Sequence, residues 1–329
     1  MLGTLKRVAI AIFTLFLVMT VTFFLIHQTP GDVIQEMAAL YAQQYGVSIE
    51  EGTRIATSFY GYNLDEPLWA QYLDYVGRLL KGELGYSLIY RVSVNQVIVK
   101  ALPWTVFVLS ISLLLSFSLG MIMGVTIAWK RKTILDPLVT AYASFTGATP
   151  DYITALVLLI IFAIRLHWFP TKGAYDSALK PAFNWPFIKS VLHHAVLPIV
   201  AYTFENTAAW ALAMKGSAVS VLGEDYITAA RARGLKERRI MFNYMGRNAI
   251  LPMVTGLAIA LGGMLGGSAL IETIFNYPGV GWFFTNAVNR RDYGMMQGLF
   301  LLTAAAVIFA NLVADLLYSV LDPRIKLEE

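Results

Sequence analysis

The sequence predicts an all-α polytopic membrane protein with six transmembrane helices, and three observations carry this prediction. Only 14% of the 329 residues are charged, whereas a typical soluble domain has about 25%. Hydrophobic residues make up 57% of the chain, and its mean hydropathy is +0.61. Six stretches approach the roughly 20 mainly apolar residues that a spanning helix needs. The chain has no cysteine, so disulfides and thiolate chemistry are excluded.

The predicted spans are distributed along the whole chain. Lys6 and Arg7 precede the first, but the "HQTPGD" that follows it lacks the cleavage pattern of a signal peptide, so we expect a retained anchor. The third is interrupted at Thr149-Pro150-Asp151, and the fifth is rich in glycine. The spans are Val8–Gln28, Pro103–Trp129, Leu138–Ile164, Ala195–Met214, Leu251–Phe275 and Leu299–Leu321.

The distribution of Lys and Arg predicts that both termini lie in the cytoplasm. With Lys6 and Arg7 placed inside, the cytoplasmic segments hold 14 Lys and Arg in 58 residues, and the outer segments hold 11 in 127. This asymmetry follows the positive-inside rule. The cytoplasmic segments are 1–7, 130–136, 215–250 and 322–329, and the outer ones are 29–102, 165–194 and 276–298.

Segment 29–102 is predicted to form an external subdomain, because it is too long for a simple connection. "GVSIEEGTRIATSFYG" and "PLWAQYLDYVGRLLKG" show helical apolar spacing. Pro67 and Gly82 suit the ends of the second helix. A surface for a partner and a lid on the chain's own spans both remain open. The apolar positions of the second helix are Leu68, Tyr72, Tyr75, Val76 and Leu79.

Segment 165–194 carries aromatic residues of the kind found at membrane interfaces, together with two adjacent histidines. His193 and His194 are sequence neighbours, so they point to different faces of a helix, and no third ligand stands nearby. We therefore expect interfacial polar residues here and no metal site. The aromatic residues are Trp168, Phe169, Trp185 and Phe187.

Segment 215–250 contains the charged stretch "EDYITAARARGLKERR". Its spacing predicts a short helix that ends at Gly234, since glycine readily takes a left-handed cap conformation. A second helix, "LKERRIMFNYMGRNAILP", is expected to reach Pro252. The pair could lie on anionic lipid or enter a groove on a soluble partner; a nucleic-acid role is set aside because no wider basic fold supports it. The predicted apolar row is Val219, Leu222, Tyr226 and Ala230.

Carboxylates within the predicted spans are candidate functional groups, because charges inside a membrane are costly. Asp151 and Glu205 are candidates to face a transport path, Glu272 suggests a structural or gate role, and Asp315 fits capping or pairing better. Small residues allow close helix contact in lipid, so the glycines of the fifth span are candidates for the path or for a subunit interface. These are Gly256, Gly262, Gly263, Gly266 and Gly267.

The charged stretch resembles the coupling loop of the membrane subunits of binding-protein-dependent ABC importers. Thr228-Ala229-Ala230 stand at the positions of the EAA motif, Gly234 at its glycine and Leu251-Pro252 at its Leu-Pro. Thr228 in place of Glu, and the longer gap before Leu-Pro, are similar to the oligopeptide/dipeptide-type permeases. Further matches to that subfamily follow in order over nearly the whole chain: "QTPGD", "GELGYSLIYRVSVNQVI", "HWFPTKG", "GGSALIETIFNYPGVG" and "ADLLYSVLDPRIK".

The resemblance implies a type I ABC importer fold in a bacterial or archaeal cytoplasmic membrane. It implies a second homologous permease subunit, two ATPase subunits that bind ATP and Mg, and an extracytoplasmic substrate-binding protein. This chain has no G-x-x-x-x-G-K-[S/T] sequence, so we expect no cofactor in it and ATP hydrolysis by partner chains. The residues expected to couple to an ATPase are Glu224, Asp225, Tyr226, Thr228, Ala229, Ala230, Arg231, Arg233 and Gly234.

The implied organisation has three parts and leaves the cargo open. Residues 1–28 form the N-terminus and first span, 29–102 the external subdomain, and 103–329 the permease core with the 215–250 loop. Related permeases carry oligopeptides, dipeptides, oligosaccharides or nickel chelates. An ion-coupled secondary transporter that uses the buried carboxylates is the alternative, although no internal repeat is evident. An intramembrane enzyme is disfavoured, because neither H-E-x-x-H nor G-x-S-x-G occurs.

Overall fold

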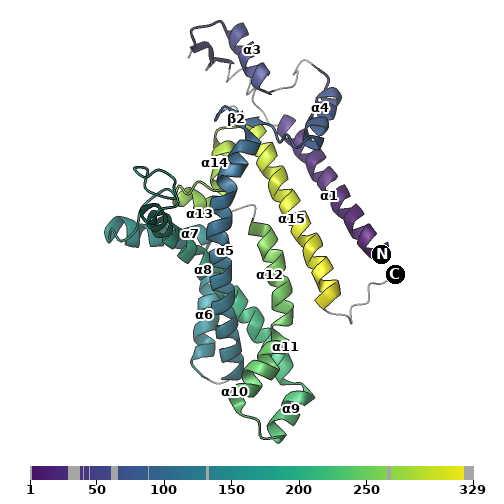
Figure 1. Cartoon of the computed structure of the whole chain (residues 1–329), viewed down its shortest axis with the longest axis vertical. Helices are drawn as coiled ribbons and strands as arrows, with labels where there is room; N and C mark the ends of the chain where they lie inside the picture. Colours follow the sequence, from purple (N-terminus) through teal and green to yellow (C-terminus); the bar gives the residue numbers. More distant parts are fainter. Residues whose placement is uncertain are drawn as a thin grey trace.

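The structure is a computed structural model that describes residues 2–28, 38–39, 41–43, 45–60, 66–87, 89–130, 133–264 and 268–321. These residues form an elongated bundle of helices with one short two-stranded ribbon. Figure 1 shows α3 (Ile49–Tyr60) and α4 (Leu68–Leu80) at one end of the bundle and α9 (Asp225–Ala232) at the opposite end. We call these the α3 end and the α9 end.

Four of the described helices are long and apolar enough to cross a membrane, and a sharply bent helix pair makes five if it counts as one span. The long helices contain the predicted first, second, fourth and sixth spans. They are α1 (Leu2–His27), α5 (Val94–Trp129), α8 (Trp185–Leu222) and α15 (Tyr293–Leu321).

The predicted third span is sharply bent rather than straight. α6 (Leu135–Ala148) and α7 (Asp151–Leu158) meet at an angle of 100°, and η1 (Leu159–Arg165) continues α7 as a π-helix. The expected interruption at Thr149-Pro150 is confirmed, since Thr149 has the extended backbone that a following proline favours.

The predicted fifth span, Leu251–Phe275, is wrong as a single helix. α12 (Leu251–Gly263) and α13 (Ala269–Ile274) are separate helices. Ser268 accepts a hydrogen bond from the backbone N–H of Ile271 and so begins a new helix. The glycine-rich composition of this stretch disfavours one continuous helix.

Three spanning helices begin earlier than expected, because a polar side chain caps each start. Ser93 Oγ accepts from Gln96 N at 3.3 Å at the start of α5, nine residues before Pro103. Asn184 Oδ1 accepts from Phe187 N at 3.0 Å, so α8 begins ten residues before the predicted Ala195. At α15, Asp292 Oδ1 accepts from Met295 N at 3.2 Å. The expected outer loop 276–298 also contains a helix, α14 (Val280–Asn289).

The centre of the bundle is the contact between α5 and α8. A Cβ on Gly124 of α5 would lie 2.6 Å from both the carbonyl oxygen of Ala211 and the Cβ of Met214 on α8. Gly120, one turn earlier, is equally crowded by Trp210 and Ala211. Glycines therefore let the two backbones approach closely, as small residues do between helices in lipid.

Both helices predicted in segment 29–102 are confirmed as α3 and α4. Tyr72, Tyr75, Val76 and Leu79 of α4 pack against α1 and α15, whereas Leu68 is 50% exposed and lies outside this contact. α4 thus covers the chain's own spans. The subdomain boundaries 1–28, 29–102 and 103–329 stay a prediction.

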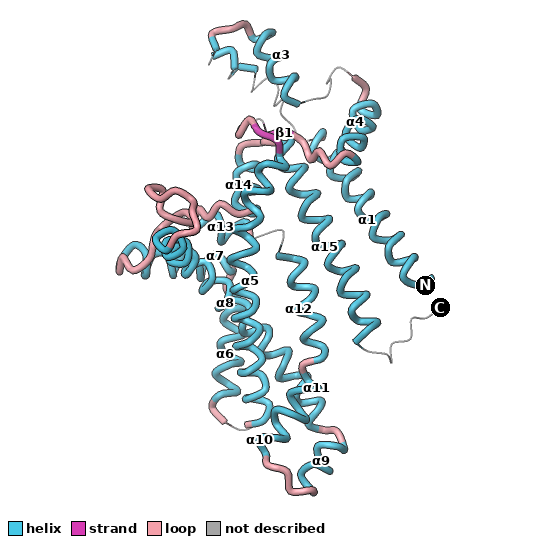
Figure 2. The backbone as a smooth tube through the Cα atoms, viewed as in Figure 1, coloured by secondary structure: helices cyan, strands magenta, loops and turns pink. Residues whose placement is uncertain are grey.

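The buried side chain of Asp292 joins the short β-ribbon to the start of α15. Figure 2 shows strands β1 (Tyr86–Ser87) and β2 (Val92–Ser93) as a small antiparallel ribbon near the start of α5. Asp292 is 1% exposed, and its Oδ2 accepts from Ser87 Oγ at 2.5 Å and from Ile89 N at 3.3 Å. One carboxylate therefore both caps α15 and holds the ribbon.

Candidate functional site

The 215–250 segment folds into a succession of short helices at the α9 end of the bundle (Figure 1). The predicted first helix corresponds to α9. The predicted second helix is helical but irregular, because a π-helical turn separates two short α-helical pieces. After α9 come α10 (Glu237–Arg239), η2 (Ile240–Gly246) and α11 (Arg247–Ala249), which lead into α12.

The predicted apolar row of this segment is wrong. Val219 and Leu222 belong to α8, which ends at Leu222 before α9 begins, so they share no helix face with Tyr226. Tyr226 is 39% exposed, and its hydroxyl accepts from Asn248 Nδ2 at 3.1 Å. The apolar spacing continues across the boundary between α8 and α9, so the spacing alone does not show where α8 ends.

The buried side of α9 packs on the chain itself. Ile227 and Ala230 are 0% and 3% exposed, and they join one apolar cluster with residues of α8, η2 and α11. Burying these apolar side chains fixes α9 to the bundle. Eight of the nine predicted coupling residues are exposed and most of them are polar, whereas Ala230 is buried.

Arg231 is also engaged within the chain. Its guanidinium carbon lies 5.4 Å from the ring centroid of Trp129, the last residue of α5, in cation–π geometry. Its Nε lies 3.7 Å from Glu237 Oε1, and both side chains are more than half exposed. Arg231 therefore ties α9 to α5, in addition to any contact with a partner.

Gly234 has the left-handed backbone conformation that was expected, with φ of +70°. Gly234 N donates to Arg231 O at 2.9 Å, and Leu235 N donates to Ala230 O at 3.3 Å, which satisfies the last carbonyls of α9. A Cβ built on Gly234 would meet nothing within 4 Å. Glycine is thus favoured here by backbone conformation and not by crowding.

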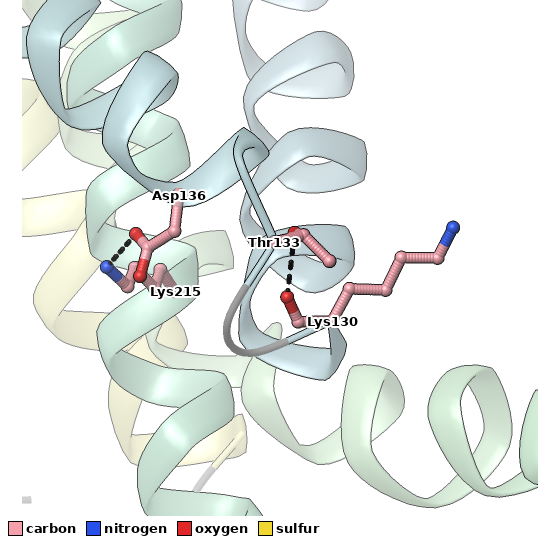
Figure 3. Close-up of polar contacts among 4 residues, drawn as sticks. All are labelled: Lys130, Thr133, Asp136 and Lys215. Carbon is pink, nitrogen blue, oxygen red and sulfur yellow. Dashed lines mark hydrogen bonds and ion pairs between the residues drawn. The ribbon is translucent and has the colours of Figure 1, made fainter.

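An ion pair joins α6 to α8 near the α9 end. Figure 3 shows Lys215 Nζ of α8 reaching Asp136 Oδ1 in the first turn of α6. Nearby, Thr133 Oγ1 donates to Lys130 O at 2.9 Å. Because both members of the pair are about two-thirds buried, the contact is shielded from solvent more than a surface pair.

Asp151 and Glu205 both lie in the region where α7 packs on α8. Asp151 is the first residue of α7, directly after the bend, and Thr154 Oγ1 one turn later donates to the Glu205 carboxylate. Both carboxylates remain partly accessible. This position is compatible with contact to a solute, and their role in a path stays a prediction.

Glu272 lies in a buried network and is 3% exposed. Its Oε1 accepts from Thr105 Oγ1 at 2.9 Å, and its Oε2 accepts from Trp282 N at 3.0 Å. Thr105 Oγ1 in turn accepts from Val280 N at 2.8 Å. Glu272 and Thr105 therefore satisfy free N–H groups in the first turn of α14 and hold that helix to α5.

The predicted glycine cluster is only partly described. Gly262 and Gly263 end α12, and a Cβ on Gly256 would lie 3.3 Å from the Trp210 ring. Gly266 and Gly267 lie outside the described residues, as does the side chain of Asp315. The close-packed Gly120 and Gly124 were missed, although the four-residue spacing in "GMIMG" is a signal for them.

In the described structure, both histidines hydrogen-bond to backbone carbonyl groups of segment 165–194. His193 Nε2 donates to Trp168 O at 2.9 Å, and His194 Nδ1 donates to Ser190 O at 2.7 Å. Within the described ranges, no group of three or more His, Cys, Asp or Glu is arranged to hold a metal ion.

Several apolar spanning helices, with buried polar networks between them, define a multi-pass membrane protein. The chain belongs to the family of binding-protein-dependent transport system inner membrane components, which matches residues 116–327. Members of this family are membrane subunits of transporters and not enzymes, and they work with a substrate-binding protein. This confirms the resemblance stated from the sequence.

Characterised relatives extend the match over almost the whole chain. The di/tripeptide transport system permease protein DppB of Pseudomonas aeruginosa is 33% identical and covers 98% of this chain and 97% of its own. The oligopeptide transport system permease protein AppB of Bacillus subtilis is 33% identical over 80% of this chain and 83% of its own. The dipeptide transport system permease protein DppB of Escherichia coli is 30% identical and covers 98% of each chain.

Proposed function

We propose that this chain is one permease subunit of an ATP-driven ABC importer for oligopeptides or dipeptides, with oligosaccharides as a related cargo. The observation that supports it most is the nearly full-length similarity to relatives named as peptide permeases. In the proposal, α12 and α13 together complete six spans. Both termini lie in the cytoplasm, so the α9 end is cytoplasmic and the α3 end faces the binding protein.

The proposed coupling element is residues 224–234, whose polar side docks in a cleft of an ATPase subunit. Two ATPase subunits bind ATP and Mg, and a second homologous permease completes the path. The internal contacts of α9 support this role, because Ile227 and Ala230 are packed on the bundle and Arg231 lies on Trp129 at the end of α5. A force on α9 would therefore reach α5 and α8 directly.

The test replaces Gly234 in the complete importer. Gly234→Asp places a side chain at φ +70°, a conformation that costs roughly 1–2 kcal/mol for an L-residue. We expect normal membrane insertion with loss of ATPase association and of peptide uptake. Gly223→Ala is the matched control, because Gly223 has φ of −79° at the other end of α9 and accepts a side chain without such strain.

Two outcomes would count against this proposal. Uptake by Gly234→Asp at the wild-type rate would contradict the coupling role of this loop. Uptake that continues without any ATPase subunit, and collapses with the ion gradient, would favour the secondary transporter. The cargo is then identified by a ligand panel on the cognate binding protein, with peptides compared against β-linked oligosaccharides.

A further inference from the structure

The first three turns of α8 have two chemically distinct faces. Pro186, Lys189, Ser190, His193 and His194 line one cavity, whereas Phe187, Ile188, Val191 and Leu192 line another. At 100° per residue these two sets fall on opposite sides of the helix. A helix that separates polar from apolar residues in this way suits the boundary between lipid headgroups and acyl chains.

The polar cavity has a volume of about 650 Å³ and lies between α8 and the loop 170–179. Lys172 from the loop and Lys189 from α8 both line it. Asp176 is the carboxylate among the lining residues, and its Oδ1 accepts from Ala178 N at 3.0 Å. Two lysines against one aspartate leave a surplus of positive charge, which favours an anionic group.

Hydrogen bonds fix the loop that forms one wall of the polar cavity. Ser190 Oγ accepts from Asp176 N at 2.9 Å, and Gly173 N donates to Phe275 O at 3.0 Å. The loop is thereby attached to α8 and to the end of α13. Both lysines are consequently presented by anchored backbone, which lowers the entropic cost of gathering them around one ligand.

The apolar groove has a volume of about 570 Å³ and lies between residues 103–107 of α5, the loop 181–183 and the first turns of α8. Trp104 and Phe107 of α5 form one side of it, and Phe183 borders it fully exposed. Exposed Trp168 and Trp185 nearby in the chain are of the residue type enriched at membrane interfaces. A groove of this composition fits acyl chains.

Tyr175 joins the two cavities. It lines the polar cavity, and its ring packs on Phe187 and on Trp104 of the apolar groove, with centroid distances of 5.0 and 5.8 Å. The two cavities therefore adjoin at this ring, and they offer neighbouring surfaces to the anionic head and the apolar tails of one molecule. A soluble anion would leave the groove unused.

We propose that the polar cavity at Lys172 and Lys189 and the adjoining apolar groove form a binding site for an anionic glycerophospholipid. The two lysines hold the phosphate, and the acyl chains lie along Trp104, Ile188 and Val191. This site lies at the end of α8 opposite to α9, so it is separate from the proposed coupling element. A bound lipid would stabilise the start of α8 against the loop.

The experiment measures lipids retained by the full-length chain, in complex with the partners that copurify with it, after exchange into mild detergent. Native mass spectrometry compares dioleoyl phosphatidylglycerol with dioleoyl phosphatidylcholine. We expect selective retention of phosphatidylglycerol, weakened roughly 25-fold by Lys172→Gln/Lys189→Gln, at about five-fold per lysine. Lys180→Gln is the control, since Lys180 is exposed in the same segment but lines neither cavity.

A second arm tests the groove and the source of the phosphate. Val191→Asn should weaken phosphatidylglycerol retention several-fold, whereas Val219→Asn, an exposed position farther along α8, should not. Glycerol 3-phosphate or a tripeptide at millimolar concentration should fail to displace the lipid. Displacement by either compound would overturn the proposal in favour of a soluble-anion site. Unchanged retention by the double lysine variant would overturn it outright. Neither readout depends on transport or on ATP.

Discussion

The network of Thr105, Glu272 and the first turn of α14 gives the sharpest stability prediction. Thr105→Val keeps the side-chain shape but removes a hydroxyl that is 0% exposed. The buried N–H of Val280 then has no acceptor, which costs about 1–3 kcal/mol. The lost hydrogen bond to Glu272 adds about 1 kcal/mol. We therefore expect a total loss near 3 kcal/mol.

Thermal unfolding of the purified protein, compared at one heating rate, measures this effect. A loss of this size corresponds to a fall in apparent Tm of roughly 5 °C. Thr303→Val is the matched control, because Thr303 Oγ1 donates only to Leu299 O of its own helix, at 2.9 Å. If Thr105→Val lowers the Tm no more than Thr303→Val does, the network does not hold α14 to α5 and the reasoning is refuted.

Two further substitutions test the other buried polar contacts. Asp292→Asn keeps the size of the side chain but replaces one acceptor oxygen by a donor. It should therefore lower the free energy of unfolding by about 2 kcal/mol and increase protease cleavage within residues 86–93. An unchanged cleavage rate would contradict the role of Asp292 in holding the ribbon. Lys215→Met should lower the free energy of unfolding by about 1–2 kcal/mol, because it leaves Asp136 partly buried without its cation. Adding Asp136→Asn should recover much of that loss. Equal stability of the single and double variants would argue against the ion pair.

The sequence predicts elements well where a single apolar run has capping residues at its ends. Four of the six runs locate the long helices α1, α5, α8 and α15, because a helix satisfies all its backbone hydrogen bonds within lipid. Their starts were misplaced by up to ten residues, at α8, since the polar first turns of α5 and α8 read as loop. Ser93 and Asn184, both good N-cap residues, were the available signals.

The candidate site was predictable in position but not in orientation. The charged composition and Gly234 located α9, and the φ of +70° confirms the expected turn. Which side of α9 is buried depends on Ile227 and Ala230 meeting η2 and α11, residues that follow later in the chain. In a helix of only eight residues with two partly apolar faces, apolar periodicity cannot show which face is buried. The clamp at Asp292 had no signal beyond a polar residue before an apolar run, because its partner lies 205 positions away.

The continuity of α8 connects the proposed lipid site to the proposed coupling element. One 38-residue helix runs from the amphipathic turns at Trp185 to Leu222, two residues before the coupling segment. A Cβ on Gly120 or Gly124 would clash with α8, so α5 packs directly against this helix, and packed interfaces of this kind switch between discrete arrangements rather than deform gradually. If α9 is the coupling element, we expect its displacement to move α5 and α8 together.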